Sequence, residues 1–193
     1  MENSPKIDLT VSHPLEHTFT LLYQEKPVRG DYIIWGGMEK VMDIDTIEKF
    51  WQMYNSIIKT NEIEVGEYLY FFKKDIEPTW EDPNHTNGGE FVLKFNKDKK
   101  LNNNNLNEVW MRCCLLIIGN ICDNDEYITG VLAQTTKRDH KIKIWTKTTD
   151  EIIIRHIGSD IWRSVPMFND DIFFKSFDID TSGQKVNYKI LRS

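Results

Sequence analysis

The feature that most constrains this fold is a set of short strand-like segments joined by links too short for parallel crossovers. The segment Lys141–Trp145 alternates polar and apolar side chains, as a strand with one covered face does. Two parallel neighbours need a connection of a dozen or more residues, usually a helix. The strand-like segments are Phe19–Tyr23, Tyr32–Trp35, Tyr68–Lys73, Phe91–Phe95, Ile128–Gln134, Lys141–Trp145 and Ile172–Phe177.

Three intervening segments have apolar residues at the three- and four-residue steps of a helix. The predicted helices are Asp45–Lys59, Asn107–Ile118 and Thr149–Ile157. Asp45 is the expected N-cap of the first, with Glu48 completing a capping box. The third is expected to be capped by Thr149 or Asp150 and to end at Gly158. Strands with helices between them predict an α+β fold, a curved antiparallel sheet with helices on one face.

Composition limits the classes of function. The 193 residues carry 24 Lys and Arg against 30 Asp and Glu, a net charge of −6, which argues against coating duplex nucleic acid through many phosphates. The polar N-terminus is unlike a signal peptide, and the longest apolar run, Cys113–Ile118, is too short to span a bilayer. The three cysteines lack a C-x-x-C pair, which predicts buried reduced thiols, no metal and no cofactor.

The expected organisation is one domain over residues 13–193, preceded by a flexible arm over residues 1–12. The segment Glu77–Pro83 interrupts the strand pattern, because two prolines flank Trp80. A loop tryptophan is unusual, since loops are mostly exposed and tryptophan is mostly buried. Trp35 also lies at a strand end, so the two tryptophans can form a slot for a flat ring, with a carboxylate beside one of them to read its edge. The alternative is that both are local hydrophobic plugs.

A series of short stretches keeps a specific order and spacing from His13 nearly to the C-terminus. They are His13–Leu15, Trp35, Asp45–Trp51, Ile76–Asp82, Gly88–Gly89, Trp110, Leu115–Gly119, Lys141–Thr146 and His156–Gly158. In these stretches the chain resembles the eukaryotic translation initiation factor 4E family, the mRNA 5′ cap-binding proteins. The resemblance implies an eight-stranded curved antiparallel sheet, three helices on its convex face and a cap slot on its concave side.

The resemblance also implies roles for individual residues in binding 7-methylguanosine. Trp35 and Trp80 would sandwich the base, and Glu81 would accept hydrogen bonds from the guanine N1–H and 2-amino group. Trp145 would pack near the N7-methyl group, the alternative being a core residue on a strand. N7-methylation makes the base cationic, so each indole face adds a cation–π attraction of about 0.5–2 kcal/mol.

The triphosphate bridge needs cations, and here the chain departs from the family pattern. Lys141 matches a phosphate-binding lysine. Thr136 and Glu90 stand where the family often has Arg, and a reversed charge beside a phosphate is expected to weaken binding. We expect Lys137 or Arg138 to compensate, the alternative being that both belong to a solvated loop. Near the C-terminus, Gln184 replaces a residue often phosphorylated in animal members, and Lys185 is expected near the second nucleotide.

A second surface is implied on the opposite face, where the family docks the Tyr-x4-Leu-Φ helix of factor 4G or of 4E-binding repressors. The matching positions are His13, Pro14, Ile47, Trp51, Met111, Arg112 and Leu115. For Trp51 the alternative is a core residue on an apolar helix stripe. Arg112 replaces the family's usual Glu, which predicts repulsion of a basic partner residue.

The sequence is compatible with three functions. The first is a cap-binding translation initiation factor, not an enzyme, monomeric outside its complex and cytoplasmic with a nuclear fraction. The second is a divergent adaptor or translational repressor with weakened cap binding. The third is an enzyme that uses Glu81 and Asp82 as acid and base, which adjacent residues on an extended loop suit poorly because their side chains point apart.

Overall fold

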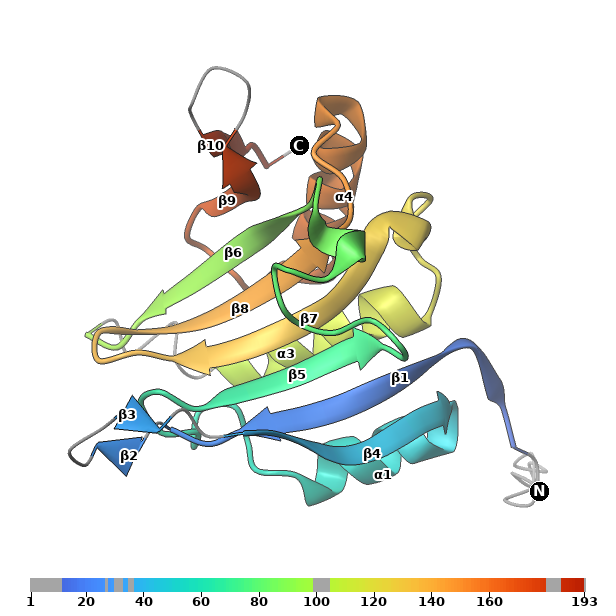
Figure 1. Ribbon diagram of the computed structural model, residues 1–193. Helices are drawn as coiled ribbons and strands as arrows, with labels where there is room; N and C mark the ends of the chain where they lie inside the picture. Colours follow the sequence, from blue (N-terminus) through green and yellow to red (C-terminus); the bar gives the residue numbers. More distant parts are fainter. Residues whose placement is uncertain are drawn as a thin grey trace, which may run out of the picture.

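The computed structural model describes residues 12–26, 28–29, 33–34, 37–98, 105–179 and 185–192. Its main feature is an eight-stranded antiparallel sheet in the order β10-β9-β6-β8-β7-β5-β1-β4 (Figure 1). The strands are β1 (Pro14–Gln24), β4 (Met38–Thr46), β5 (Tyr68–Lys73), β6 (Gly89–Asn96), β7 (Ile128–Thr135), β8 (Asp139–Thr146), β9 (Ile172–Ile179) and β10 (Lys185–Ile190), with a small ladder of β2 (Val28–Arg29) and β3 (Ile33–Ile34). The predicted fold class is confirmed.

Besides β2 of the small ladder, two strands were not predicted from the sequence, β4 and β10. Both lie at the edges of the sheet, where a strand has a neighbour on only one side. The β4 sequence, MEKVMDIDT, and the β10 sequence, KVNYKI, carry more charge than the central strands β5 (YLYFFK) and β7 (ITGVLAQT). The predicted strand Tyr32–Trp35 overlaps β3 at residues 33–34, and its two end residues lie outside the described residues.

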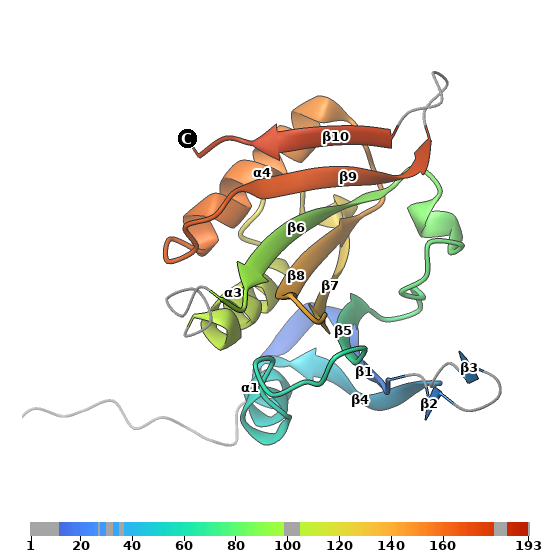
Figure 2. The same ribbon diagram turned by 90° about the vertical axis from the view of Figure 1, so that its left-hand side faces the viewer.

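Helices α1 (Ile47–Ser56), α3 (Leu106–Ile118) and α4 (Glu151–Ser164) lie on one side of the sheet, as Figure 2 shows. The main core lies between them and the sheet. Phe19 and Phe71 stack there with ring centroids 4.9 Å apart, and Trp110 of α3 stacks on Tyr54 of α1. Among the described residues, no helix is long and apolar enough to cross a membrane.

Helix α1 begins one residue later than the predicted capping box requires. Its N-cap is Thr46, whose side-chain oxygen accepts a hydrogen bond from the backbone N–H of Lys49 at 3.2 Å. Asp45 forms an ion pair with the Lys49 side chain instead. Glu48 does not turn back to the cap, because its carboxylate accepts from the backbone N–H of His13. The predicted capping box is therefore wrong.

Gly158 does not end α4, as the sequence suggested, but lies inside it. The helix begins after Asp150, whose carboxylate accepts from the N–H groups of Ile152 and Ile153, so Asp150 and not Thr149 is the cap. A Cβ added at Gly158 would lie 2.5 Å from Ile190 of β10. The glycine thus serves close packing between α4 and the edge strand. The three cysteines are free and buried, as expected.

Candidate ligand-binding face and helical docking surface

The face of the sheet that the helices leave uncovered carries a second apolar cluster. The cluster consists of Tyr70 and Phe72 of β5, Leu132 of β7 and Trp145 of β8. They share this face because side chains alternate between the two faces along a strand. Trp145 meets Phe72 edge to face at 5.5 Å and lies 4.5 Å from Phe177. Packing on these sides fixes the plane of the Trp145 ring.

Beside Trp145 lies a cavity of about 540 Å³. Its lining residues are Trp80, Glu90, Trp145, Lys175, Ser176, Phe177, Asp178 and Lys185. Trp80 is 64% exposed, whereas Trp145 is 8% exposed. The structure therefore brings Trp80 and Trp145 together at one cavity, within the size range typical of small-ligand sites. Glu81 is exposed beside Trp80, and Trp35 lies outside the described residues.

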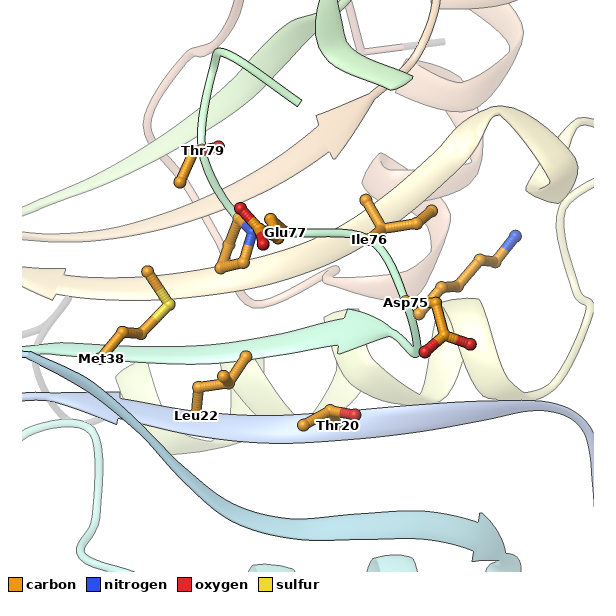
Figure 3. A pocket seen from close by; sticks show the side chains of 9 residues that line it. Thr20, Leu22, Met38, Asp75, Ile76, Glu77 and Thr79 are labelled. Carbon is orange, nitrogen blue, oxygen red and sulfur yellow. The ribbon is translucent and has the colours of Figure 1, made fainter. Parts of the chain in front are cut away.

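A second cavity of about 560 Å³ lies beneath the loop that leads to Trp80 (Figure 3). Thr20 and Leu22 of β1 and Met38 of β4 line one side, and the loop from Asp75 to Thr79 lines the other. The loop is joined to the sheet at its start, where the Lys74 N–H donates to the Thr18 carbonyl. Since the cavity separates the middle of the loop from β1, Trp80 needs a second attachment.

His85 supplies that attachment. It follows Trp80 in the short 3₁₀ turn Pro83–His85 and is fully buried. Its Nδ1 lies 2.7 Å from the Thr79 carbonyl oxygen, and its Nε2 lies 3.0 Å from the Thr129 hydroxyl on β7. A carbonyl only accepts, so Nδ1 carries the proton and the neutral ring accepts from Thr129 at Nε2. Burial lowers the His85 pKa, which favours this neutral form.

The same ring supports Trp145, with centroids 5.0 Å apart and planes nearly perpendicular. His85 thus connects the loop of Trp80 to the strand of Trp145. Sequence analysis missed it, because a lone histidine in a polar loop carries no pattern. Asp82 holds the turn as well, since its carboxylate accepts from the N–H groups of Glu77 and Asn84. These bonds give Asp82 a structural role rather than an acid–base one.

Glu90, expected to oppose a phosphate, is engaged by its neighbours. Its Oε2 accepts a hydrogen bond from Trp145 Nε1 at 3.1 Å and lies 3.0 Å from Lys143 Nζ. The carboxylate therefore orients the indole and is neutralised by an ammonium group. Sequence analysis did not single out Lys143, because only the fold brings β6 and β8 side by side.

The remaining predicted phosphate residues lie along β8 and beyond it. Lys141 is on the same face as Trp145, and its pKa is lowered by burial and by the charge of Lys143. Lys137 and Arg138 are exposed in the turn before β8. At about 3.3 Å per strand residue, they lie about 23–26 Å along the chain from Trp145. They are therefore not part of the cavity.

On the helix-covered side, α1 and α3 present the predicted docking residues. Trp51 is 39% exposed and packs edge to face on Phe50 and Tyr54, while Ile47 is exposed beside it. The other matching positions are the exposed His13 and Pro14 and the half-buried Met111, Arg112 and Leu115. Trp51 is thus a surface residue, not a core one.

Two polar side chains on this surface, His13 and Arg112, already have partners within the chain. His13 Nδ1 lies 2.6 Å from Glu48 Oε1, and this contact holds the pKa of Glu48 at about 2. Arg112 donates from Nε and from Nη2 to the Glu108 carboxylate, at 2.9 Å each. The positive charge predicted to repel a basic partner is therefore partly compensated within α3.

Comparison with known proteins agrees with this architecture. A family model described as Eukaryotic initiation factor 4E matches residues 14–190. Eukaryotic translation initiation factor isoform 4E-2 of Triticum aestivum is 33% identical over 177 residues, covering 90% of this chain and 80% of that protein. Eukaryotic translation initiation factor 4E of Candida albicans is 31% identical over 177 residues, covering 90% and 83%.

Solved structures give the same result. Ascaris suum eIF4E-3 in complex with an m2,2,7G cap is 27% identical with a TM-score of 0.79, covering 92% of this chain and 98% of that one. Schistosome eIF4E complexed with m7GpppG and 4E-BP is 26% identical with a TM-score of 0.76, covering 92% and 99%. With a family model that spans nearly the whole sequence, this chain belongs to the eukaryotic initiation factor 4E family.

Proposed function

We propose that this protein binds the 7-methylguanosine cap of mRNA on the uncovered face of its sheet and, in the cytoplasm, recruits a 4G-type scaffold through α1 and α3 to start translation. The observation that carries the proposal is the cavity between the exposed indole of Trp80 and the fixed indole of Trp145. The Ascaris suum relative, solved with a methylated cap, supports the same ligand class. The proposal involves no catalysis.

The cavity suits a flat cationic base. The exposed face of Trp80 is available for stacking, worth about 1–3 kcal/mol per base, and Trp35 is the proposed second face. Glu81 on the same loop would accept from the guanine N1–H and 2-amino group, a pairing that a positive ring strengthens. Glu90 and His85 hold the Trp145 indole in one orientation, beside the proposed position of the N7-methyl group. Its role in the proposal is contact with that methyl group.

The phosphates are assigned to the cationic side of β8. Lys141 is the proposed phosphate ligand from the resemblance, and it lies on the same face of the sheet as Trp145, four residues before it on β8. Lys137 and Arg138 are farther away, so any role falls on the RNA beyond the first phosphates. If a Lys137→Ala/Arg138→Ala variant leaves cap-analogue affinity and its salt dependence unchanged, the two residues are excluded from cap binding.

The partner surface suits an amphipathic helix. The surface presents apolar groups on neighbouring helices, which a helix-in-groove complex requires. They come from Ile47, Trp51, Met111 and Leu115. The Schistosome relative was solved with a 4E-binding protein, which supports a partner of this class. We assign the surface to a Tyr-x4-Leu-Φ helix of a 4G-like scaffold or 4E-binding protein.

Fluorescence titration with 7-methyl-GTP and GTP tests the proposal. Quenching of tryptophan with a strong preference for the methylated nucleotide supports cap binding. Retention on a 4G peptide without affinity for 7-methyl-GTP would replace the proposal with the adaptor or repressor function. Turnover of a capped substrate would contradict the proposal and support an enzyme.

A further inference from the structure

Strand β8 presents three functional groups in succession on the uncovered face: Lys141, Lys143 and Trp145. Lys143 is the strand neighbour of Leu132, which belongs to the same apolar cluster as Trp145, so the two side chains share that face. Alternate residues of a strand are about 6.6–6.8 Å apart. Lys143 therefore lies between the indole proposed to contact the base and the lysine proposed to contact phosphate.

Lys143 is also held in place. Its Nζ lies 3.0 Å from Glu90 Oε2, and the two side chains are only 18% and 16% exposed. Trp145 donates to the same carboxylate oxygen, which ties the ammonium and the indole to one group. A cation fixed before the ligand arrives loses little conformational freedom on binding.

The pair with Glu90 leaves Lys143 able to bind an anion. An ammonium group has three N–H donors, and the Glu90 contact uses one of them. Lys141, two residues before it on β8, adds positive charge to the same face, whereas Lys94, the strand neighbour of Lys141 on β6, is paired with Asp139. Like charges held this close favour an anion between them.

We propose that Lys143 binds the phosphate nearest the 7-methylguanine base, in place of the arginine that Glu90 replaces. The inference rests on the proposed function and extends it to a residue outside the family's matched motif. Glu90 and Lys143 then act together, since the carboxylate expected to oppose the phosphate holds the cation that binds it. The ligand chemistry is a 5′-linked phosphate chain on a cationic base.

Lys175 offers a matched comparison. It lines the cavity beside Trp145 from β9, whereas Lys143 lies next to that cavity, and Lys175 is the strand neighbour of Glu90 on the other side. Lys175 is exposed, whereas Lys143 is mostly covered and ion-paired. If the phosphates left the cavity toward β9 and β10, Lys175 would be the residue that binds them.

The test is titration of the full chain and of the Lys143→Met and Lys175→Met variants with 7-methyl-GTP, 7-methylguanosine and GTP, at low and moderate salt. Methionine keeps an unbranched apolar stem without the charge. We expect Lys143→Met to weaken 7-methyl-GTP binding about tenfold, the usual scale for one lost charge-assisted hydrogen bond, and to reduce its salt dependence. The nucleoside, which has no phosphate, is expected to bind both variants as it binds the wild type.

Because Lys143→Met leaves Glu90 without its cation, the comparison is repeated in a Glu90→Gln background, where the amide oxygen still accepts from Trp145. The same loss on adding Lys143→Met supports the inference. Unchanged 7-methyl-GTP affinity in both backgrounds, or a larger loss for Lys175→Met, overturns it. If the wild type itself does not prefer 7-methyl-GTP over GTP, the proposed function has failed, and that result is read before any variant.

Discussion

The two faces of the sheet are stabilised in different ways. On the helix-covered face, large apolar side chains such as Phe19, Phe71 and Trp110 are buried against one another and against α1 and α3. On the uncovered face, Trp145 is held by polar groups as well, through its bond to Glu90 and its contact with the His85 ring. Trp80, a few residues away from His85 in sequence, stays largely exposed.

The difference shows how one fold separates stability from binding. Apolar packing gives the covered face its stability but leaves few groups free to meet a ligand. Directed hydrogen bonds on the other face fix the positions of a few groups while leaving an indole surface open to solvent. A change on the covered face should therefore act on unfolding, and a change at Trp80 should act on ligand affinity.

The largest effect is expected at Trp110. Trp110→Ala should lower the free energy of unfolding by about 3–5 kcal/mol, because it leaves a large cavity in the core. Trp110→Phe should cost much less, since the indole N–H is buried and has no acceptor among the described residues. Urea denaturation measures both. Equal losses for the two variants would show that this N–H has a partner and that the core is not purely apolar there.

The next largest effect is expected at Trp80. Trp80→Ala should weaken 7-methyl-GTP binding by about 1–3 kcal/mol, the contribution of one stacked base. Its free energy of unfolding should stay within about 0.5 kcal/mol of the wild type, because the side chain is exposed. Trp80→Phe, which keeps a ring, should retain part of the affinity. A variant that unfolds more easily but binds normally would contradict the contrast between the faces.

Local sequence patterns predicted an element well where the same pattern continues along the whole element. Strand β5 was predicted at its observed bounds, Tyr68–Lys73, because its residues from Tyr68 to Phe72 are apolar and β-forming. Edge strands β4 and β10 were missed, since each pairs with a neighbour on only one side and has charged residues among its apolar ones. Gly158 was wrongly predicted to end α4, because the reason for a glycine there is a tertiary contact with Ile190.

In the candidate site too, some residues could be predicted from the sequence and others could not. Trp80 and Trp145 could be paired in advance only through the resemblance to a family, and the structure then placed both at one cavity. The groups that hold them could not, because the bond from Trp145 to Glu90 joins residues 55 positions apart. The contact between His85 and Thr129 spans 44 positions. Bonds over such separations leave no local signal in a single sequence.

A smaller effect, on pH dependence, is expected from His85. Burial lowers its pKa below the ordinary value of 6.5, although nearby Asp82 acts in the opposite direction. As the pH falls through 6.5, the unfolded chain takes up a proton that the folded chain does not, so stability is full above pH 6.5 and declines below it. The slope from one such group is at most about 1.4 kcal/mol per pH unit.

Thermal and urea unfolding between pH 7.5 and pH 5 measure this decline, and His85→Gln should reduce it. The part that remains belongs to His140, whose pKa burial also lowers. Staying above pH 5 avoids the carboxylates of Asp43 and Glu48, because their pKa values are lowered from 3.8 and 4.5 to about 2 and their contribution to stability is lost between these values as the pH falls. An unchanged slope in His85→Gln would mean that the ring is not held neutral by its surroundings.

The smallest effect is expected on the docking surface, at Arg112. Arg112→Glu should tighten binding of a basic Tyr-x4-Leu-Φ peptide by about 0.2–1 kcal/mol, the usual range for exposed ion pairs. The gain is limited because Arg112 already pairs with Glu108, and the variant places two acids one turn apart.

Arg155→Glu on α4 is the matched control, since Arg155 forms the same kind of pair with Glu151 but packs near the β10 edge of the sheet. Isothermal titration of the peptide against both variants separates a local effect on affinity from an effect of the protein's net charge. Tighter binding for Arg112→Glu alone places the peptide's basic residue over α3. Equal gains for both would reduce the effect to overall charge, and unchanged or weaker binding for Arg112→Glu would remove Arg112 from the docking surface.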